Sequence, residues 1–219
     1  MTGEVDGGSG AERAERAVDA LGASLLWLAL WPVPDDRRRA EIAAMADAVA
    51  EAGGLGADSP TRRRYAALTA SLDAGSPAAG PAAEPSHLPP VWVDVLAGRG
   101  RCDGPERACA TAAVLPELDG AIFAVTGLVS TAESATLRVL AWGWSPDDAP
   151  ELAAPFSWWA RDNAGRWHVG RHHWHSANWQ TVVMDVTLLP ALHPAATALE
   201  VIVTGRGGTE RATVPLTAS

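Results

Sequence analysis

From about residue 91 to the end of the chain, apolar side chains recur at every second position. The clearest run is 182–188, where valine, methionine and leucine alternate with valine, aspartate and threonine. The same spacing returns in 199–203 and in 212–216. Successive side chains of a β-strand point to opposite faces, so this spacing predicts strands with one buried face. No helix-length pattern intervenes, which favours antiparallel over parallel pairing.

Turn-forming residues separate the predicted strands. Asp162–Gly165 and Gly205–Gly208 carry the Asn, Asp and Gly content of hairpin turns. Strands are predicted over 91–96, 108–115, 120–130, 135–144, 156–161, 166–173, 179–189, 198–204 and 209–216. About eight short strands at this spacing predict a mainly β fold, an antiparallel Ig-like β-sandwich over 91–219. A closed barrel is the alternative, because sequence does not distinguish one closed sheet from two open ones.

The first 90 residues have a different organisation. Residues 1–10 are rich in glycine and are predicted to be disordered. Residues 11–74 predict a small α-helical segment of three helices, the third beginning at Ser59 as N-cap and Pro60 as first helical residue. Residues 75–90 are rich in proline and alanine, which predicts a linker between the helices and the β domain.

Two stretches of the β region resemble known proteins. They are FSWWARDNAGRWHVG, from Phe156 to Gly170, and the closing hairpin LEVIVTGRGGTERATVPL. Both are similar to the C-terminal β-sandwich domains of many uncharacterised actinobacterial proteins, which share a tryptophan-containing hairpin and a final strand pair. The resemblance covers roughly the last 100 residues. It implies a fold, and it implies no activity and no site residues.

Charge and hydropathy exclude several classes of protein. The net charge is −9, which argues against a nucleic-acid-binding protein because phosphate contacts need basic surface. The longest apolar run, Ala20–Trp31, is shorter than the roughly 20 residues that span a bilayer. Five acidic residues precede this run and no small-residue cleavage site follows it, so we expect a cytoplasmic protein rather than an exported one.

Four histidines within eight residues form the first candidate site. His173 and His175 are two apart, so on a strand they would share a face and could bind Zn²⁺. His168 would supply a third ligand, with Asp185 and His193 as alternatives. No other cofactor is expected.

Other interpretations of these histidines compete with the metal site. The chain could turn or bulge near Gly170, which would leave the histidines solvated on a loop. Neighbouring imidazoles would also make a pH-sensitive surface, because they repel one another when protonated.

Tryptophan is the second conspicuous feature. The chain has ten tryptophans, and seven of them lie between positions 142 and 179. Exposed rings on a β domain stack on sugars or anchor a protein partner, which makes Trp158, Trp159, Trp174 and Trp179 candidate binding residues. The alternative is that some of them pack in the core and others dock the helical segment.

Motifs for catalysis are missing from the sequence. There is no G-x-S-x-G, H-E-x-x-H, P-loop or G-x-G-x-x-G. Cys102 and Cys109 have no metal-ligand spacing; they would form either a short-loop disulfide or two free thiols. Arginine triplets at 37–39 and 62–64 oppose the dipole of the helices that they begin, which suggests contact with an acidic partner. Solvated triplets are the simpler interpretation.

These observations favour a non-enzymatic module that binds a protein partner or serves as an accessory to an assembly. A carbohydrate- or metal-binding module that uses the Trp- and His-rich region 158–179 is the first alternative. An enzyme of unrecognised class is the second. No nucleic-acid partner and no membrane span are expected.

Overall fold

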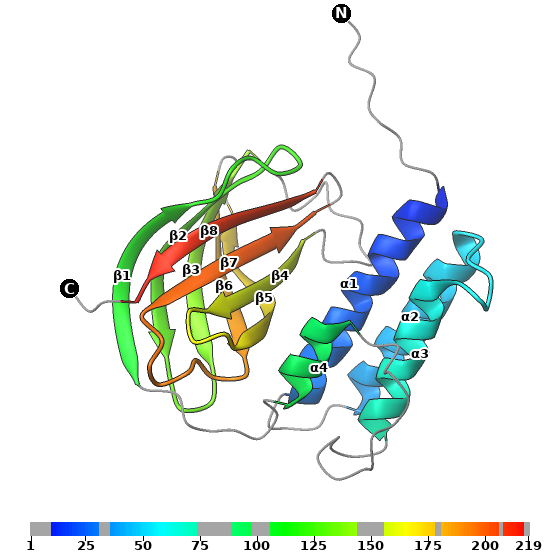
Figure 1. The fold of residues 1–219 in the computed structure, drawn as a ribbon. Helices are drawn as coiled ribbons and strands as arrows, with labels where there is room; N and C mark the ends of the chain where they lie inside the picture. Colours follow the sequence, from blue (N-terminus) through cyan, green and yellow to red (C-terminus); the bar gives the residue numbers. More distant parts are fainter. Residues whose placement is uncertain are drawn as a thin grey trace, which may run out of the picture.

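A barrel-like sheet and a layer of helices beside it make up the fold (Figure 1). The structure is a computed structural model. It describes residues 10–30, 36–73, 89–97, 106–143, 156–177, 181–205 and 208–216, with the backbone alone over 174–177. The predicted disorder of residues 1–9 and most of the predicted linker lie outside these residues.

Three of the helices form where the sequence predicts them. The helices are α1 (Gly10–Leu30), α2 (Asp36–Ala52), α3 (Pro60–Asp73) and α4 (Pro90–Ala97). The predicted cap of α3 is confirmed, because the hydroxyl of Ser59 accepts a hydrogen bond from the backbone N–H of Arg62 at 3.1 Å. Helix α2 ends at Gly54, whose φ of 69° suits a residue without a side chain.

The prediction of a strand over 91–96 is wrong, because these residues lie in helix α4. Pro90 occupies the first helical position, where its missing N–H costs no hydrogen bond. Trp92, Val95 and Leu96 are buried and follow helical spacing. A segment of only eight residues can fit both the two-residue spacing of a strand and the spacing of a helix. Packing against the other helices therefore determines that this segment is helical.

Eight antiparallel strands form one sheet that curls until its edges meet (Figure 1). The strands are β1 (Arg107–Val114), β2 (Ile122–Ser130), β3 (Ala135–Trp142), β4 (Ser157–Asp162), β5 (Trp167–Ala177), β6 (Thr181–Leu189), β7 (Ala198–Thr204) and β8 (Thr209–Pro215). Their order is β1-β2-β3-β6-β5-β4-β7-β8. The mainly β, antiparallel prediction is confirmed. The two sheets of an Ig-like sandwich are not formed, because a single ladder joins all eight strands into a nearly closed barrel.

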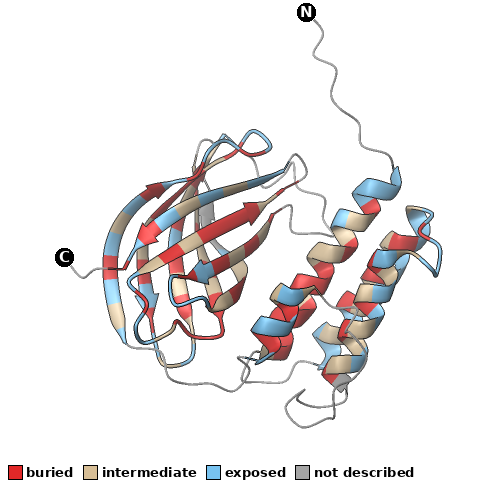
Figure 2. Ribbon diagram, in the orientation of Figure 1, coloured by how far each residue is buried: buried red, intermediate tan, exposed pale blue. Residues whose placement is uncertain are grey.

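The interior of the barrel is filled by side chains. The ring of Phe123 meets the edges of Phe156 and Trp158 at centroid distances of 4.9 and 5.3 Å. Buried residues alternate with exposed ones along the strands, as Figure 2 shows. The alternation that predicted the strands therefore corresponds to a packed core.

One tryptophan of α1 attaches the helical layer to the barrel. Trp27 is 3% exposed and donates its indole N–H to the carbonyl oxygen of Thr187 on β6 at 3.0 Å. The guanidinium of Arg171 lies over its ring at 5.2 Å, and the ring of His173 meets it at 6.2 Å. Val169 on β5 is completely buried beneath the helices. The helices and the outer face of β5 and β6 thus form a second buried core beside the barrel interior.

The arginine triplets are used within the helical layer. Arg64 on α3 holds Asp19 on α1 at 2.8 Å, and Arg62 lies 3.7 Å from Asp47 on α2. Arg37 and Arg38 pair with a glutamate one turn further along α2. The pairs of Arg62 and Arg64 join different helices, whereas those of Arg37 and Arg38 lie within α2. Contact with an acidic partner stays a prediction.

Replacing Trp27 tests whether the layers depend on this contact. We expect Trp27→Ala to lower the free energy of unfolding by about 3–5 kcal/mol, because it removes a buried ring. We expect about 1–2 kcal/mol for Trp27→Phe, which mainly loses the hydrogen bond to Thr187. Urea unfolding followed by far-ultraviolet circular dichroism measures both. The control is Val93→Ala, at a 40% exposed position; a Trp27→Ala effect no larger than this control would refute the role of Trp27.

Candidate functional site

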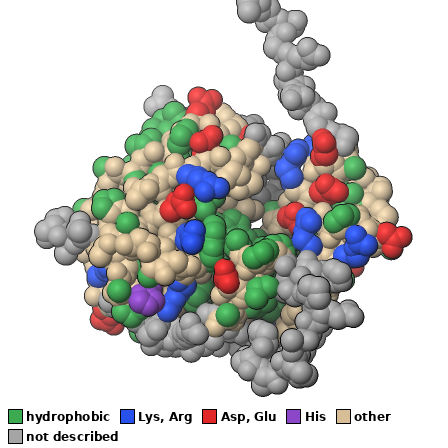
Figure 3. All heavy atoms as spheres, in the orientation of Figure 1, with side chains coloured by type: hydrophobic (Ala, Val, Ile, Leu, Met, Phe, Trp, Pro, Cys, Tyr) green, Lys and Arg blue, Asp and Glu red, His purple; other side chains and the backbone are tan. Residues whose placement is uncertain are grey.

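A cleft lies between the helical layer and the barrel, where β5 continues past the start of β4. Pairing between β4 and β5 ends at Trp158 and Gly170, so the rest of β5 has no β4 neighbour. The cleft has a volume of about 410 Å³. It is lined by Ala20, Leu21, Ala23, Ser24, Arg38, Ile42, Met45, Phe156, Ser157, Gly170, Arg171, His172 and His173. Figure 3 shows a hollow between the barrel and the helices.

The lining of the cleft is divided between apolar and basic side chains. Leu21, Ile42 and Met45 present hydrocarbon from α1 and α2. Arg38 on α2 and Arg171 and His173 on β5 contribute two guanidinium groups and one imidazole on the side of the helices. No carboxylate occurs among the described residues that line the cleft. Such a lining suits a ligand with an apolar body and a negatively charged end.

His172 lies on β5 between Arg171 and His173, and its side chain points to the barrel side of the sheet, where its cross-strand partner Val186 is buried. Burial, followed by repulsion from His173 and from Arg171, lowers its pKa to about 4. The imidazole is therefore neutral at neutral pH. His172 therefore adds no positive charge beside Arg171 and His173 at this pH.

The guanidinium groups of the cleft have partners that fix their positions. Arg38 pairs with Glu41 on the next turn of α2 at 3.2 Å. Arg171 stacks on Trp27, and this contact holds its side chain on the helix-facing side of β5. Sequence reasoning missed Arg171 as a site residue, although it directly precedes two histidines. Arg38 was considered only as a member of a triplet.

His168 and His173, two of the predicted metal ligands, are not brought together. Strand β5 runs without a break through Gly170, and its irregularity lies between Trp174 and Ser176. His168 and His173 are five residues apart on this strand, so they point to opposite faces of the sheet. The side chain of His175 is outside the described residues. Among the described residues, no three His, Cys, Asp or Glu side chains are grouped to hold a metal ion.

The four candidate tryptophans have different environments. Trp158 is 2% exposed in the barrel core, where its ring has no face for a sugar. Trp159 points to the opposite face of the sheet and packs against the buried residues between the helices and the barrel. The side chain of Trp174 and the whole of Trp179 lie outside the described residues. The placement of Trp158 and Trp159 agrees with core packing and with docking of the helices, respectively.

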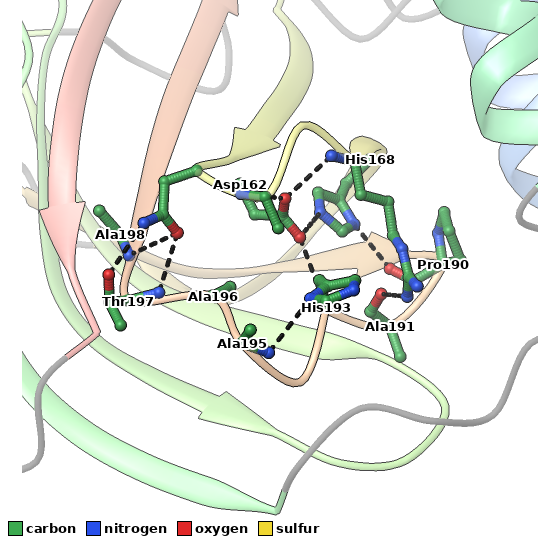
Figure 4. Close-up of polar contacts among 12 residues, drawn as sticks. Asp162, His168, Pro190, Ala191, His193, Ala195, Ala196, Thr197 and Ala198 are labelled. Atoms are coloured by element: carbon green, nitrogen blue, oxygen red, sulfur yellow. Dashed lines mark hydrogen bonds and ion pairs between the residues drawn. The ribbon is translucent and has the colours of Figure 1, made fainter.

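A buried polar network closes the end of the barrel away from the cleft (Figure 4). Asp162, at the end of β4, accepts hydrogen bonds from the backbone N–H groups of Arg166 at 2.9 Å and His193 at 3.0 Å. His168 Nδ1 donates to the carbonyl oxygen of Pro190 at 2.8 Å, and its Nε2 lies 3.5 Å from Asp162. The β4–β5 hairpin thereby holds the loop between β6 and β7.

Asp162 is ionised although it is buried. Burial alone would raise its pKa, but the interaction with His168 and the backbone hydrogen bonds from His193 and Arg166 lower it to about 2. Asp162 and His168 are both shielded from solvent. Their role is therefore structural, and the pair is not accessible to a substrate.

The two cysteines make no site in the described part of the chain. Cys109 is a buried free thiol on β1. Cys102 lies outside the described residues, as do Trp144 and residues 145–155.

Comparisons with known proteins leave this site without a precedent: no family model, no curated protein and no solved structure matches the chain. None of the helices in the described residues has the length and apolar character needed to cross a membrane.

Replacing Asp162 tests the network by its pH dependence. The folded-state pKa lies below the ordinary value of 3.8, so ionised Asp162 stabilises the folded protein above about pH 4 by about 2 kcal/mol. This contribution is lost as the pH falls through about 2. We expect Asp162→Asn to lower the free energy of unfolding by about 2–4 kcal/mol at pH 7 and by progressively less towards pH 2. Urea unfolding at a series of pH values measures the difference.

The control for this series is Asp58→Asn, which makes the same chemical change at an exposed position. Its effect should stay within about 0.5 kcal/mol at each pH. An Asp162→Asn effect that is equally large at pH 7 and at pH 2 would contradict the assignment.

Proposed function

We propose that the chain is a non-enzymatic binding module that takes a small amphipathic organic anion in the cleft between its helices and its barrel. The observation that carries this proposal is the division of one lining into an apolar side and a basic side. The volume of about 410 Å³ is in the range of small-molecule sites. Within the Trp- and His-rich region 158–179, the proposal assigns binding to the residues that face this cleft.

The basic wall on β5 and the apolar wall on α1 and α2 set the orientation in which the ligand would bind. Its anionic end would lie at the β5 wall, near Arg171 and His173, where a carboxylate relieves the repulsion among neighbouring basic groups. Its apolar part would extend along Leu21 and Ile42 of the helices. The ligand would then contact both layers, so binding would strengthen their association.

Two features support binding rather than catalysis. The buried acid–imidazole pair, Asp162 and His168, is enclosed at the other end of β4 and β5. Within the cleft, Ser24 donates its hydroxyl to the carbonyl of Ala20 at 3.1 Å, as a helical serine commonly does. The described cleft residues therefore provide recognition chemistry, and we assign no nucleophile among them.

A protein partner is the second proposal, and it rests on a different surface. The outward residues of β1 are small and apolar, and Val114 on β1 and Val129 on β2 are 58% and 54% exposed. Such a surface suits a flat protein contact. A photo-crosslinking residue at position 129 should capture a partner in cells of the native host, whereas one at position 63 should not. Equal capture at both positions would exclude this face.

Fluorescent and competing ligands test the cleft. We expect 8-anilinonaphthalene-1-sulfonate, an apolar anion, to gain fluorescence on binding the wild-type protein, and octanoate to displace it. We expect 1-octanol, the matched neutral compound, to compete at least tenfold less well, because it cannot form charge-assisted hydrogen bonds. Titration at constant ionic strength measures these affinities.

Variants place this binding in the cleft. Arg171→Gln and Arg38→Gln should each weaken octanoate binding about tenfold. Arg63→Gln makes the same charge change on an exposed part of α3 and should leave binding unchanged. Equal affinities in all three variants, or equal competition by octanoate and octanol, would refute the proposal.

A further inference from the structure

The inner face of the barrel beside β1 carries polar groups that the rest of the structure does not explain. Arg107 on β1 and Ser130 on β2 are directly opposite each other in the antiparallel ladder, so their side chains share one face. Ser130 is 2% exposed, and its hydroxyl has no hydrogen-bond partner among the described residues. This pair lies where the edges of the sheet, β1 and β8, come together.

Arg107 uses only part of its hydrogen-bonding capacity. Its Nη1 donates to the carbonyl oxygen of Ala196, in the loop between β6 and β7, at 2.7 Å. Its Nε and Nη2 are buried and have no partner in the described part of the chain. These two nitrogens form the edge of a guanidinium that holds a carboxylate or phosphate through two parallel hydrogen bonds.

The cost of such an arrangement points to a bound acceptor. Arginine stays protonated at every pH at which the protein is folded, so it cannot escape burial by losing its charge. A buried donor without a partner destabilises the fold, and a charged donor does so more strongly than a neutral one. Arg107 is partly exposed and is the first residue of β1, opposite the last residue of β2, so it stands at the rim of the barrel.

We propose that Arg107 and Ser130 form a binding site for a small oxyanion, a carboxylate or phosphate group, at the rim of the barrel. Two oxygens of the ligand accept from Nε and Nη2 of Arg107, and one also accepts from the hydroxyl of Ser130. The site is separate from the cleft, because β3 and β6 lie between β2 and β5 in the sheet. Occupancy would neutralise Arg107 and support the loop that it holds.

Thermal unfolding in different anions tests this site. We expect sodium phosphate or sodium acetate to raise the melting temperature of the wild-type protein saturably, beyond sodium chloride of equal ionic strength. The larger of the two shifts identifies the phosphate or the carboxylate as the preferred group. Isothermal titration with the same two salts gives the affinity.

Three variants and one control assign the effect to these residues. Arg107→Gln should abolish the anion-specific shift, and Arg107→Lys, which keeps the charge without the planar edge, should weaken binding at least fivefold. Ser130→Ala should weaken binding about threefold to tenfold. Thr111→Val is the control: its hydroxyl is also buried without a partner, but it lies four residues, roughly 13 Å, along β1.

The outcomes separate clearly. An unchanged response in Thr111→Val together with its loss in Arg107→Gln supports the site. If phosphate and acetate stabilise the wild-type protein no more than chloride does, or if folded Arg107→Lys responds as the wild type does, the proposal is wrong.

Discussion

The attachment of α1 to the barrel through Trp27 is the contact on which the architecture depends. The indole ring contacts a guanidinium and an imidazole of β5, and its N–H reaches a backbone carbonyl of β6. The outer faces of these two strands carry buried apolar residues, such as Val169, that need the helices as cover. The cleft lies beside α1, where β5 extends past the start of β4. Its proposed ligand would occupy the part of the interface that the two layers leave open.

The other end of the barrel is organised by a polar rather than an apolar contact. Asp162 links the β4–β5 hairpin to the β6–β7 loop, because its carboxylate accepts hydrogen bonds from backbone N–H groups of both segments. Arg107 reaches the same loop from β1. The loop is thus held by two distant parts of the sheet, the β4–β5 hairpin and β1.

Alternation of apolar and polar residues was enough to predict the strands and most helices, because a buried face imposes its period on the sequence. It could not predict α4, where eight residues fit both periods, or closure of the sheet, which depends on strand order. For the candidate site, the sequence identified the histidine-rich strand, but it did not identify the helices α1 and α2 that form the other wall of the cleft. Arg38 and Arg171 are 133 positions apart, and only docking of the helices brings them together. Asp162 was missed because it occupies an ordinary turn position.

The distance along the chain between Trp27 and its acceptor has a consequence for biosynthesis. The indole is made 160 residues before Thr187. At a translation rate of roughly 5–20 residues per second, α1 emerges from the ribosome on the order of ten seconds or more before its docking surface exists. Throughout that interval its apolar stripe can be covered only by α2 and α3 or by a chaperone. The ion pair between Arg64 and Asp19 joins α1 to α3 early, so it can hold a provisional helical unit together until the sheet is complete.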